Sequence, residues 1–366
     1  MSSENATSSP PGNEASVVFS KSGAIGHILL NRPKALNALD LTMVDAITVK
    51  LREWENDATV VAIVIEGAGE KAFCAGGDIR GLYDARKRND DVLLDAFYRR
   101  EYCLNNYIAT YPKPYVALMN GITMGGGVGV SVHGHFRVVT ERTLFAMPET
   151  GIGFFPDVGG GYFLSRCPGQ IGLYLGLTGA RIKAADCLYA DLATHNVNSE
   201  NIAALKSDLS AIKGGSDPFA AVKKVLDDHH VKGDEAALKP LRTEIDKLFG
   251  ADTVADIFAA LDASSTDFAK ETVKILRSKS PIAVCVTFEQ IRQGRNMTLA
   301  QDLAMEFRLS QRTVRMPDLF EGVRAVIVDK DHSPKWQHAD IGQVDPRDVA
   351  TYFDLLPEDK ELKLQF

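Results

Sequence analysis

Two patterns of hydrophobic residues alternate along the first half of the chain. Short runs rich in Val, Ile and Leu are separated by stretches in which apolar residues recur every three or four positions. The runs are typical of buried strands and the longer spacing is typical of amphipathic helices. Strands are therefore predicted at 24–30, 60–66, 114–119, 136–140 and 143–147, and helices at 41–57 and 81–109. Such alternation predicts an α/β layer structure.

The helix predicted at 41–57 has the clearest pattern. Asp40 stands directly before it, where a carboxylate can accept hydrogen bonds from free amides of the first turn. Its apolar residues recur at helical spacing and predict one core-facing stripe, made of Leu41, Val44, Ile47, Leu51 and Trp54.

Beyond about residue 190 the pattern becomes helical, with periodic segments near 199–212, 217–230, 235–249, 251–262 and 265–278. Two later helix starts carry capping signals: Ser280 before Pro281, and Thr298 with Gln301 three positions on. Whether these helices cover a site or form subunit contacts stays open at this point. The polar residues 1–16 are expected to be a disordered tail, so the chain divides into 1–16, 17–190 and 191–366.

Composition narrows the class of protein. The chain has 366 residues, 45% of them hydrophobic and 24% charged, with a net charge of −7 and scattered basic residues. This balance argues against a nucleic-acid partner, and no apolar run approaches the ~20 residues of a membrane span. Five widely spaced cysteines favour a reducing compartment. A bacterial-type cytoplasmic location is expected, although a processed mitochondrial protein would have the same features.

Glycine is concentrated beside apolar residues in three segments: "FCAGGDI" (73–79), "NGITMGGGVGVSVHG" (120–134) and "FAMPETGIGFFPDVGGG" (145–161). Glycine lets a ligand approach backbone N–H groups, so two such turns facing each other would supply two donors to one oxyanion. Tight helix–strand packing is the alternative explanation of the same glycines. Neither the P-loop nor the dinucleotide-binding fingerprint is present.

Together these motifs resemble the crotonase (enoyl-CoA hydratase/isomerase) superfamily, and within it most closely the 3-hydroxyisobutyryl-CoA hydrolase branch. The resemblance implies an α/β fold, a spiral of ββα turns followed by a mostly helical C-terminal region. It also implies an acyl-CoA substrate whose thioester oxygen meets the backbone N–H groups of Gly77 and Gly126. The expected reaction is hydrolysis of 3-hydroxyisobutyryl-CoA in valine catabolism, with no metal, no cofactor other than the substrate's own CoA, and possibly a homo-oligomer.

The resemblance matches Glu149 and Asp157 to the two catalytic acids of that branch, which also contact the substrate. Glu149 would activate a water molecule or attack the carbonyl itself, and Asp157 would bind the 3-hydroxyl group. Helix capping is the structural alternative for both acids. Hydratases of the superfamily carry a second glutamate at the position of Gly129, and its absence here argues against hydration.

Further residues are assigned by the same resemblance. Glu101 matches a substrate-site acid, although from its sequence alone it fits a solvated helix face equally well. The predicted CoA-binding residues are Lys34, Ala35, Leu36, Ala75, Asp78 and Ile79, with a solvated surface position as the alternative for Lys34. His133 and His135 are expected to be core or helix-end residues rather than bases or metal ligands.

The open alternatives for activity are a 3-hydroxypropionyl-CoA hydrolase, an enoyl-CoA hydratase or isomerase that takes its second acid from elsewhere, and a catalytically silent binding relative. Intact Glu149, Asp157, Gly77 and Gly126 argue against the silent relative, because a scaffold has no physical need for acids in an apolar cleft.

Overall fold

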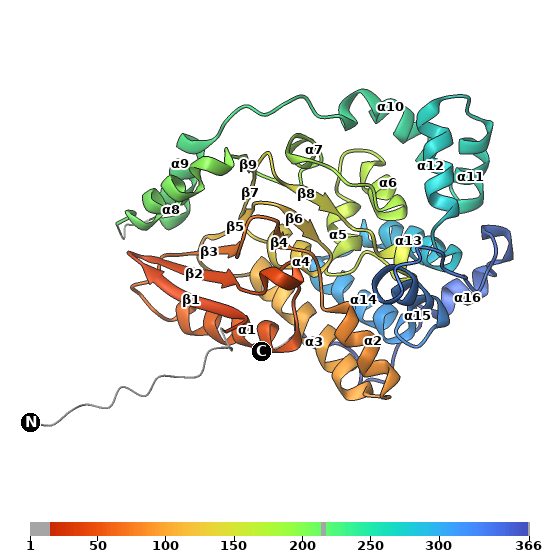
Figure 1. Cartoon of the computed structure of the whole chain (residues 1–366), viewed down its shortest axis with the longest axis horizontal. Helices are drawn as coiled ribbons and strands as arrows, with labels where there is room; N and C mark the ends of the chain where they lie inside the picture. Colours follow the sequence, from red (N-terminus) through yellow and green to blue (C-terminus); the bar gives the residue numbers. More distant parts are fainter. Residues whose placement is uncertain (1–14, 214–216, 365–366) are drawn as a thin grey trace, which may run out of the picture.

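The computed structural model describes residues 15–213 and 217–364. Two sheets occupy the middle of the molecule, and the helices of the second half form an arc along one side (Figure 1). Residues 1–14 of the predicted tail lie outside the described part. The last two residues of the predicted tail, Ala15 and Ser16, accept hydrogen bonds from Asn31 through their carbonyl oxygens.

The larger sheet has six strands in the order β1-β2-β3-β5-β7-β9. β1 and β2 are antiparallel, whereas each later pair of neighbours is parallel. The predicted runs at 24–30, 60–66, 114–119 and 136–140 form four of these strands. The bounds are β1 Val17–Ser22, β2 Ile25–Leu30, β3 Ala62–Gly67, β5 Tyr115–Met119, β7 Phe136–Val139 and β9 His195–Asn196.

A smaller parallel sheet has the order β4-β6-β8, with bounds Ala72–Cys74, Ile122–Met124 and Leu144–Ala146. The chain therefore repeats one unit three times. β3, β5 and β7 enter the larger sheet, β4, β6 and β8 follow in the smaller sheet, and helical structure comes next. This repetition confirms the predicted spiral of ββα turns, and because β4, β6 and β8 are parallel, the segments that follow them meet at one edge.

Helix α1 (Leu41–Glu55) forms as predicted, with the Asp40 carboxylate accepting from the amide of Met43 at 2.9 Å. Four residues of the predicted stripe are buried, whereas Leu41 is half-buried. The ring of Trp54 meets Phe19 of β1 edge-on, with 6.0 Å between ring centroids. The stripe therefore joins α1 to the larger sheet.

The helical stretch predicted around 81–109 is confirmed, and it consists of two helices, α2 (Ile79–Lys87) and α3 (Asp91–Ala109). Asn89 between them has a φ of +56°, a left-handed conformation that interrupts a helix. Asp90 then caps α3 by accepting from the amide of Leu93 at 3.0 Å. The break changes the direction of the chain before α3, and Glu101 and Tyr102 of α3 lie in the interior.

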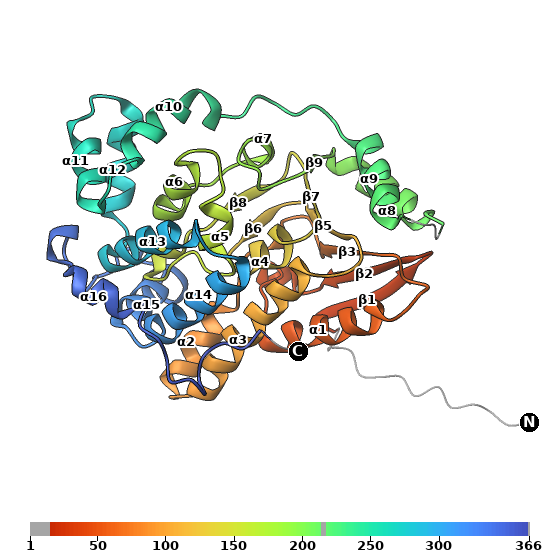
Figure 2. The same cartoon turned by 180° about the vertical axis from the view of Figure 1, so that it is seen from behind.

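The helical second half is confirmed, including both predicted capping signals. α8 and α9 pack on one face of the larger sheet, where Leu205, Leu209, Val222 and Leu226 join a buried cluster with Val64 and Val138. α13 and α14 pack on α5, and α14 also packs on α3; Figure 2 shows these helices from behind. The bounds of the helices outside α1–α3 are α4 Gly126–Val132, α5 Gly160–Leu164, α6 Ile171–Thr178, α7 Ala184–Tyr189, α8 Ile202–Ser210, α9 Pro218–His229, α10 Leu238–Phe249, α11 Val254–Ala263, α12 Asp267–Arg277, α13 Pro281–Gly294, α14 Leu299–Thr313, α15 Pro317–Val323 and α16 Pro346–Thr351.

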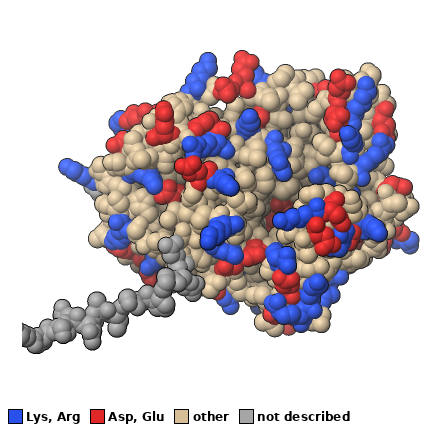
Figure 3. All heavy atoms as spheres, viewed as in Figure 1, with Lys and Arg blue, Asp and Glu red and all other residues tan. Residues whose placement is uncertain are grey.

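Charged side chains of both signs are interspersed on the face shown in Figure 3. In the described part of the chain, no helix is long and apolar enough to cross a membrane. All five cysteines are free thiols. The division at residue 190 stays a prediction, although β9 lies beyond it and pairs with β7 in the larger sheet.

Replacing Trp54 by Ala should lower the free energy of unfolding by ~3–5 kcal/mol. Trp54 is only 5% exposed, so removal of its ring leaves a cavity between α1 and the larger sheet. Val49→Ala is the matched control on the same helix, at a position 56% exposed, and should change stability by less than ~0.5 kcal/mol. Urea unfolding followed by circular dichroism measures both. Equal midpoints for the two variants would contradict the packing described.

Candidate active site

Candidate residues from all three repeats line one cavity of about 420 Å³. Gly77 follows β4, Gly126 follows β6 and Glu149 follows β8, so the shared edge of the smaller sheet brings them together. The candidates that line the cavity are Ala75, Gly77, Ile79, Glu101, Gly126, Glu149 and Asp157.

The amides of Gly77 and Gly126 lie side by side in this wall. A carbon added to the Cα of Gly126 would stand only 3.2 Å from the backbone nitrogen of Gly77. Neither amide donates a hydrogen bond to another backbone group within residues 15–213 and 217–364. The preceding glycines, Gly76 and Gly125, have φ angles of +124° and +48°, which favour glycine at these turns. The geometry suits two donors to one oxygen.

Glu149 is the first residue of a short 3-10 helix, Glu149–Ile152, and its side chain is buried. A carbon added at Gly125 would lie 3.2 Å from Glu149 Oε1, so the carboxyl group stands beside the two amides. Its Oε2 atom is buried without a hydrogen-bond partner among the described residues. Burial, and next the Asp157 carboxylate, raise the pKa of Glu149 well above its ordinary value.

Asp157 lies in the turn between this 3-10 helix and α5. The phenol of Tyr102 donates to Asp157 Oδ2 at 2.9 Å. Burial raises the pKa of Asp157 to about 7, against the opposing effect of the Tyr102 hydrogen bond. The capping alternative is wrong for Asp157, because the α5 N-cap is Gly159 and no side chain of the cap residue bonds the helix start.

Glu101 is only 1% exposed, so the alternative of a solvated helix face is wrong for this residue. Its Oε1 atom would stand 2.5 Å from a carbon added at Gly126, and it has no hydrogen-bond partner in the described part of the chain. Burial and Asp157 raise its pKa well above the ordinary value. Glu101, Glu149 and Asp157 therefore surround the paired amides.

The cavity wall also carries positive charge. Lys279 Nζ would lie 3.4 Å from a carbon added at Gly151, and Arg181 lines the same cavity. Burial and the neighbouring Arg181 lower the pKa of Lys279, whereas Glu149 acts in the opposite direction. The wall of the cavity thus combines acids with cations, and Lys279 lies beside the 3-10 helix that begins at Glu149.

The predicted CoA-binding residues are only partly brought together. Ala75 and Ile79 line the cavity, whereas Lys34 and Ala35 are exposed on a short 3-10 helix, Pro33–Ala35. The carbonyl oxygen of Leu36 accepts from the amide of Ala75 at 3.0 Å, which ties this helix to the cavity wall. The Asp78 side chain caps α2 through Gly81 and pairs with Arg32 at 2.9 Å. Their part in CoA binding stays a prediction.

The cavity also has residues from the second half of the chain, so this half covers part of the candidate site. Nothing in their local sequence distinguishes them from surface or core positions. Val326 and Ile327 belong to one π-helical turn, Arg324–Val328. The full set from this half is Ser278, Lys279, Val326, Ile327, His332 and Pro334.

The helix-end position predicted for the histidines is confirmed for His133, which directly follows α4. His133 Nε2 lies 2.7 Å from the carbonyl oxygen of Val158, and His135 Nδ1 accepts from the amide of Tyr115 at 3.3 Å. Burial lowers the pKa of His133 to about 4. Across residues 15–213 and 217–364, no three His, Cys, Asp or Glu side chains form a group that could hold a metal ion.

Gly129 has no room for the hydratase glutamate. A carbon added there would lie 2.7 Å from Val158 Cβ and 2.8 Å from Asn105 Nδ2, closer than real contacts permit. Val158 has a φ of +55°, which is unusual for a β-branched residue. The side chains of Val158, next to Asp157, and of Asn105 therefore occupy the space that a side chain at 129 would need.

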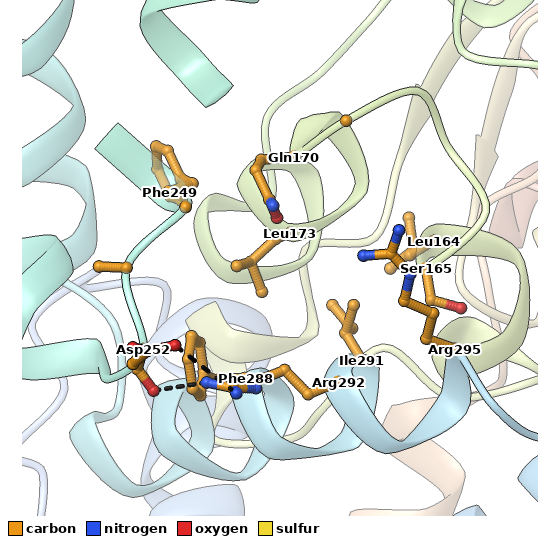
Figure 4. Close-up of a pocket in the computed structure, with 13 residues that line it drawn as sticks. Leu164, Ser165, Gln170, Leu173, Phe249, Asp252, Phe288, Ile291, Arg292 and Arg295 are labelled. Atoms are coloured by element: carbon orange, nitrogen blue, oxygen red, sulfur yellow. Dashed lines mark hydrogen bonds and ion pairs between the residues drawn. The ribbon is translucent and has the colours of Figure 1, made fainter. Parts of the chain in front are cut away.

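A second cavity, of about 330 Å³, lies apart from these residues between α6, α13 and the α10–α11 connection (Figure 4). Leu173, Phe249 and Ile291 form its apolar wall, and Arg292 at its rim pairs with Asp252. None of the candidate site residues lines it. The candidate chemistry is thus confined to the first cavity.

Comparison with known sequences gives close relatives. The chain is 49% identical over 362 residues to "3-hydroxyisobutyryl-CoA hydrolase, mitochondrial" from Danio rerio, covering 98% of this chain and 93% of that protein. The Homo sapiens protein of the same name is 48% identical over 342 residues, covering 92% of this chain and 88% of that protein.

Two solved structures share the whole fold. The structure of a carnitinyl-CoA dehydratase from Mycobacterium thermoresistibile has a TM-score of 0.90 and 41% identity, covering 96% of this chain and 99% of that one. An enoyl-CoA hydratase from Rhodobacter sphaeroides has a TM-score of 0.88 and 39% identity, with 95% and 100% coverage. The enoyl-CoA hydratase/isomerase sequence profile matches residues 25–353. The chain is therefore a member of the enoyl-CoA hydratase/isomerase family.

Proposed function

We propose that this chain hydrolyses 3-hydroxyisobutyryl-CoA to 3-hydroxyisobutyrate and free CoA, a step of valine breakdown. The observation that carries the proposal is the cavity in which the amides of Gly77 and Gly126 adjoin Glu149 and Asp157. The names of the relatives at 48–49% identity support the same activity.

In the proposed reaction, the thioester oxygen accepts hydrogen bonds from the Gly77 and Gly126 amides. The ionised Glu149 takes a proton from water as the water oxygen attacks the carbonyl carbon, or its own oxygen attacks and the resulting anhydride is then hydrolysed. The C–S bond breaks and the CoA thiolate leaves, taking up a proton. Asp157 holds the 3-hydroxyl group, and no cofactor enters these steps.

Gly129 separates this activity from hydration. Two of the solved relatives carry hydratase or dehydratase names. In this chain, however, the second glutamate expected of hydratases is absent, and the contacts of Gly129 with Val158 and Asn105 leave no space for one. Hydrolysis needs one base or nucleophile and an oxyanion site, which the cavity supplies.

The remaining assignments are also proposals. We propose that CoA is held by residues 34–36 together with Ala75, Asp78 and Ile79, and that Glu101 contacts the acyl group. The word "mitochondrial" in the relatives' names supports a mitochondrial location as the alternative to the cytoplasmic one. A homo-oligomer stays a prediction.

Release of free thiol distinguishes the candidate activities. With the purified chain, kcat/KM should be highest for 3-hydroxyisobutyryl-CoA and lower for 3-hydroxypropionyl-CoA. Enoyl-CoA esters, whose hydration releases no thiol, are followed separately by their absorbance. Turnover of enoyl-CoA without thiol release would refute the proposal, and no turnover of any ester by the folded chain would support a silent relative.

Glu149→Gln should lower kcat by about 10²–10⁴-fold while the fold is kept, because the amide neither accepts the proton nor attacks. Single turnover of the parent enzyme in ¹⁸O-water separates the two routes. Heavy oxygen incorporated into Glu149 supports the covalent route, whereas its absence leaves Glu149 as the base. Full activity of the variant would rule out both.

Gly126→Ala keeps the amide N–H but should move it away from the substrate oxygen, so kcat should fall by up to about 10²–10³-fold, the effect of losing an oxyanion donor. The added carbon would stand 2.5 Å from Glu101 Oε1 and 3.2 Å from the Gly77 nitrogen, so it displaces the wall that faces the thioester oxygen. Steady-state thiol release measures the loss. An unchanged kcat would mean that the oxyanion is bound elsewhere.

Asp157→Asn should stabilise the protein above pH 7 and lose that advantage as the pH falls toward 4. The folded protein raises the Asp157 pKa from 3.8 to about 7, so burial of this carboxylate weakens folding most where it is fully ionised. The gain has an upper limit of ~4 kcal/mol. Urea unfolding from pH 4 to 9 measures it, with the exposed Asp359→Asn as the control; a pH-independent difference would contradict the shift.

A further inference from the structure

The turn that carries Asp157 is fixed from outside the catalytic cavity. Glu306 of α14 lies behind this turn, and its two carboxylate oxygens accept from different backbone amides: Oε2 from Gly159 at 2.7 Å and Oε1 from Gly161 at 3.0 Å. Glu306 is fully buried and does not line the cavity. It therefore acts on the segment that follows Asp157, rather than on the substrate.

Gln290 of α13 completes the attachment. Its Nε2 group donates to the carbonyl oxygen of Pro156 at 2.7 Å and to Glu306 Oε1 at 2.9 Å. The backbone is thus held on both sides of Asp157, at residue 156 by Gln290 and at residues 159 and 161 by Glu306. All these groups are buried, so water does not compete for the bonds.

The turn does not have a relaxed conformation of its own. Val158 adopts a φ of +55°, a left-handed conformation that is unfavourable for a residue with a branched Cβ. Its carbonyl oxygen lies 2.7 Å from His133 Nε2. The surrounding bonds therefore hold a backbone geometry that the segment alone would not keep.

The first amides of α5 would ordinarily be capped by a side chain from the residues just before the helix. Asp157 is the acid in that position, yet its carboxylate accepts from Tyr102 and lines the cavity instead. Two acids of α14, 140 or more residues further along the chain, take its place: Glu306 accepts from the amides of Gly159 and Gly161, and Asp302 accepts from that of Tyr162. A capping group supplied from α14 leaves the Asp157 side chain free for the substrate.

Capping a helix with the buried carboxylate of Glu306 is energetically unfavourable. Burial, and next the neighbouring Asp302, raise its pKa well above the ordinary value, and no cation forms a salt bridge with it in the part of the chain described. Asp302 itself accepts from the amide of Tyr162 at 2.8 Å, beyond the turn. A structural cap alone would not require a carboxylate here, because a neutral side chain could accept one of these bonds without the cost of a buried charge.

We propose that Glu306 is a positioning residue, which orients Asp157 through the Gly159 and Gly161 amides with support from Gln290. The inference rests on the proposed function for its kinetic consequence. It assigns to the C-terminal helices a part in the reaction: α13 and α14 hold the catalytic turn from behind while other residues of this half line the cavity.

Glu306→Gln tests the proposal, since the amide keeps one acceptor oxygen but cannot accept at both positions. The variant should lose about 10- to 100-fold in kcat with KM within about 3-fold, because displacement of a catalytic group impairs the chemical step more than binding. Amide hydrogen exchange of the segment 156–162 should become faster. Ser310→Ala is the matched control, equally buried on the same helix, where the hydroxyl donates to the carbonyl oxygen of Phe307 at 2.8 Å. It should keep kcat within about 3-fold and leave exchange at 156–162 unchanged.

Gln290→Met, which keeps the length of the side chain and removes both donated bonds, provides a second variant if Glu306→Gln does not fold. It should show the same separation of kcat from KM, to a smaller extent. Unchanged kcat and exchange in these variants, or an equal loss in Ser310→Ala, would overturn the inference. A parent enzyme that releases no CoA would instead overturn the proposed function, and the exchange measurements would still decide whether Glu306 fixes the turn.

Discussion

Keeping carboxyl groups away from water is the physical constraint on which the arrangement of this protein depends. Glu101, Glu149 and Asp157 stand around one cavity, and Asp302 and Glu306 lie in the layer behind it. Each is buried, and burial raises the pKa of each. Removing carboxyl groups from water is energetically unfavourable, so a fold that buries them must provide hydrogen-bond donors at fixed positions. Here they are a phenol, a glutamine amide and the backbone of a glycine-rich turn.

The repeated ββα unit supplies cavity-lining parts of the site, one from each repeat. Three parallel strands of the smaller sheet end at one edge, and each is followed by a segment that brings one part of the chemistry. The two amide donors come from different repeats, so their separation is set by the sheet and not by a flexible loop. Donors held in this way need no rearrangement when charge develops on the substrate oxygen.

The predictability of each feature follows from how local its cause is. Asp40 and the pair Thr298 and Gln301 act within one helical turn, and each was recognisable from its neighbours. The glycine-rich segments and the acids could be assigned to one active site because their motifs together resemble those of the crotonase superfamily. The break at Asn89 depends on one left-handed residue in a polar run that is otherwise compatible with a helix. Glu306 and Lys279 depend on contacts between segments more than a hundred residues apart, which no local pattern records.

The close approach of Gly129 to Val158 also limits how this chain can diverge. A change of Gly129 to glutamate places a side chain where the side chains of Val158 and Asn105 already lie, so the mutation by itself does not produce a hydratase. The turn after Asp157 would first have to take another path, and that path is fixed by residues of α13 and α14. Interconversion of the two chemistries therefore requires concerted changes in distant parts of the sequence, and intermediates along that route would lose the old activity before gaining the new one.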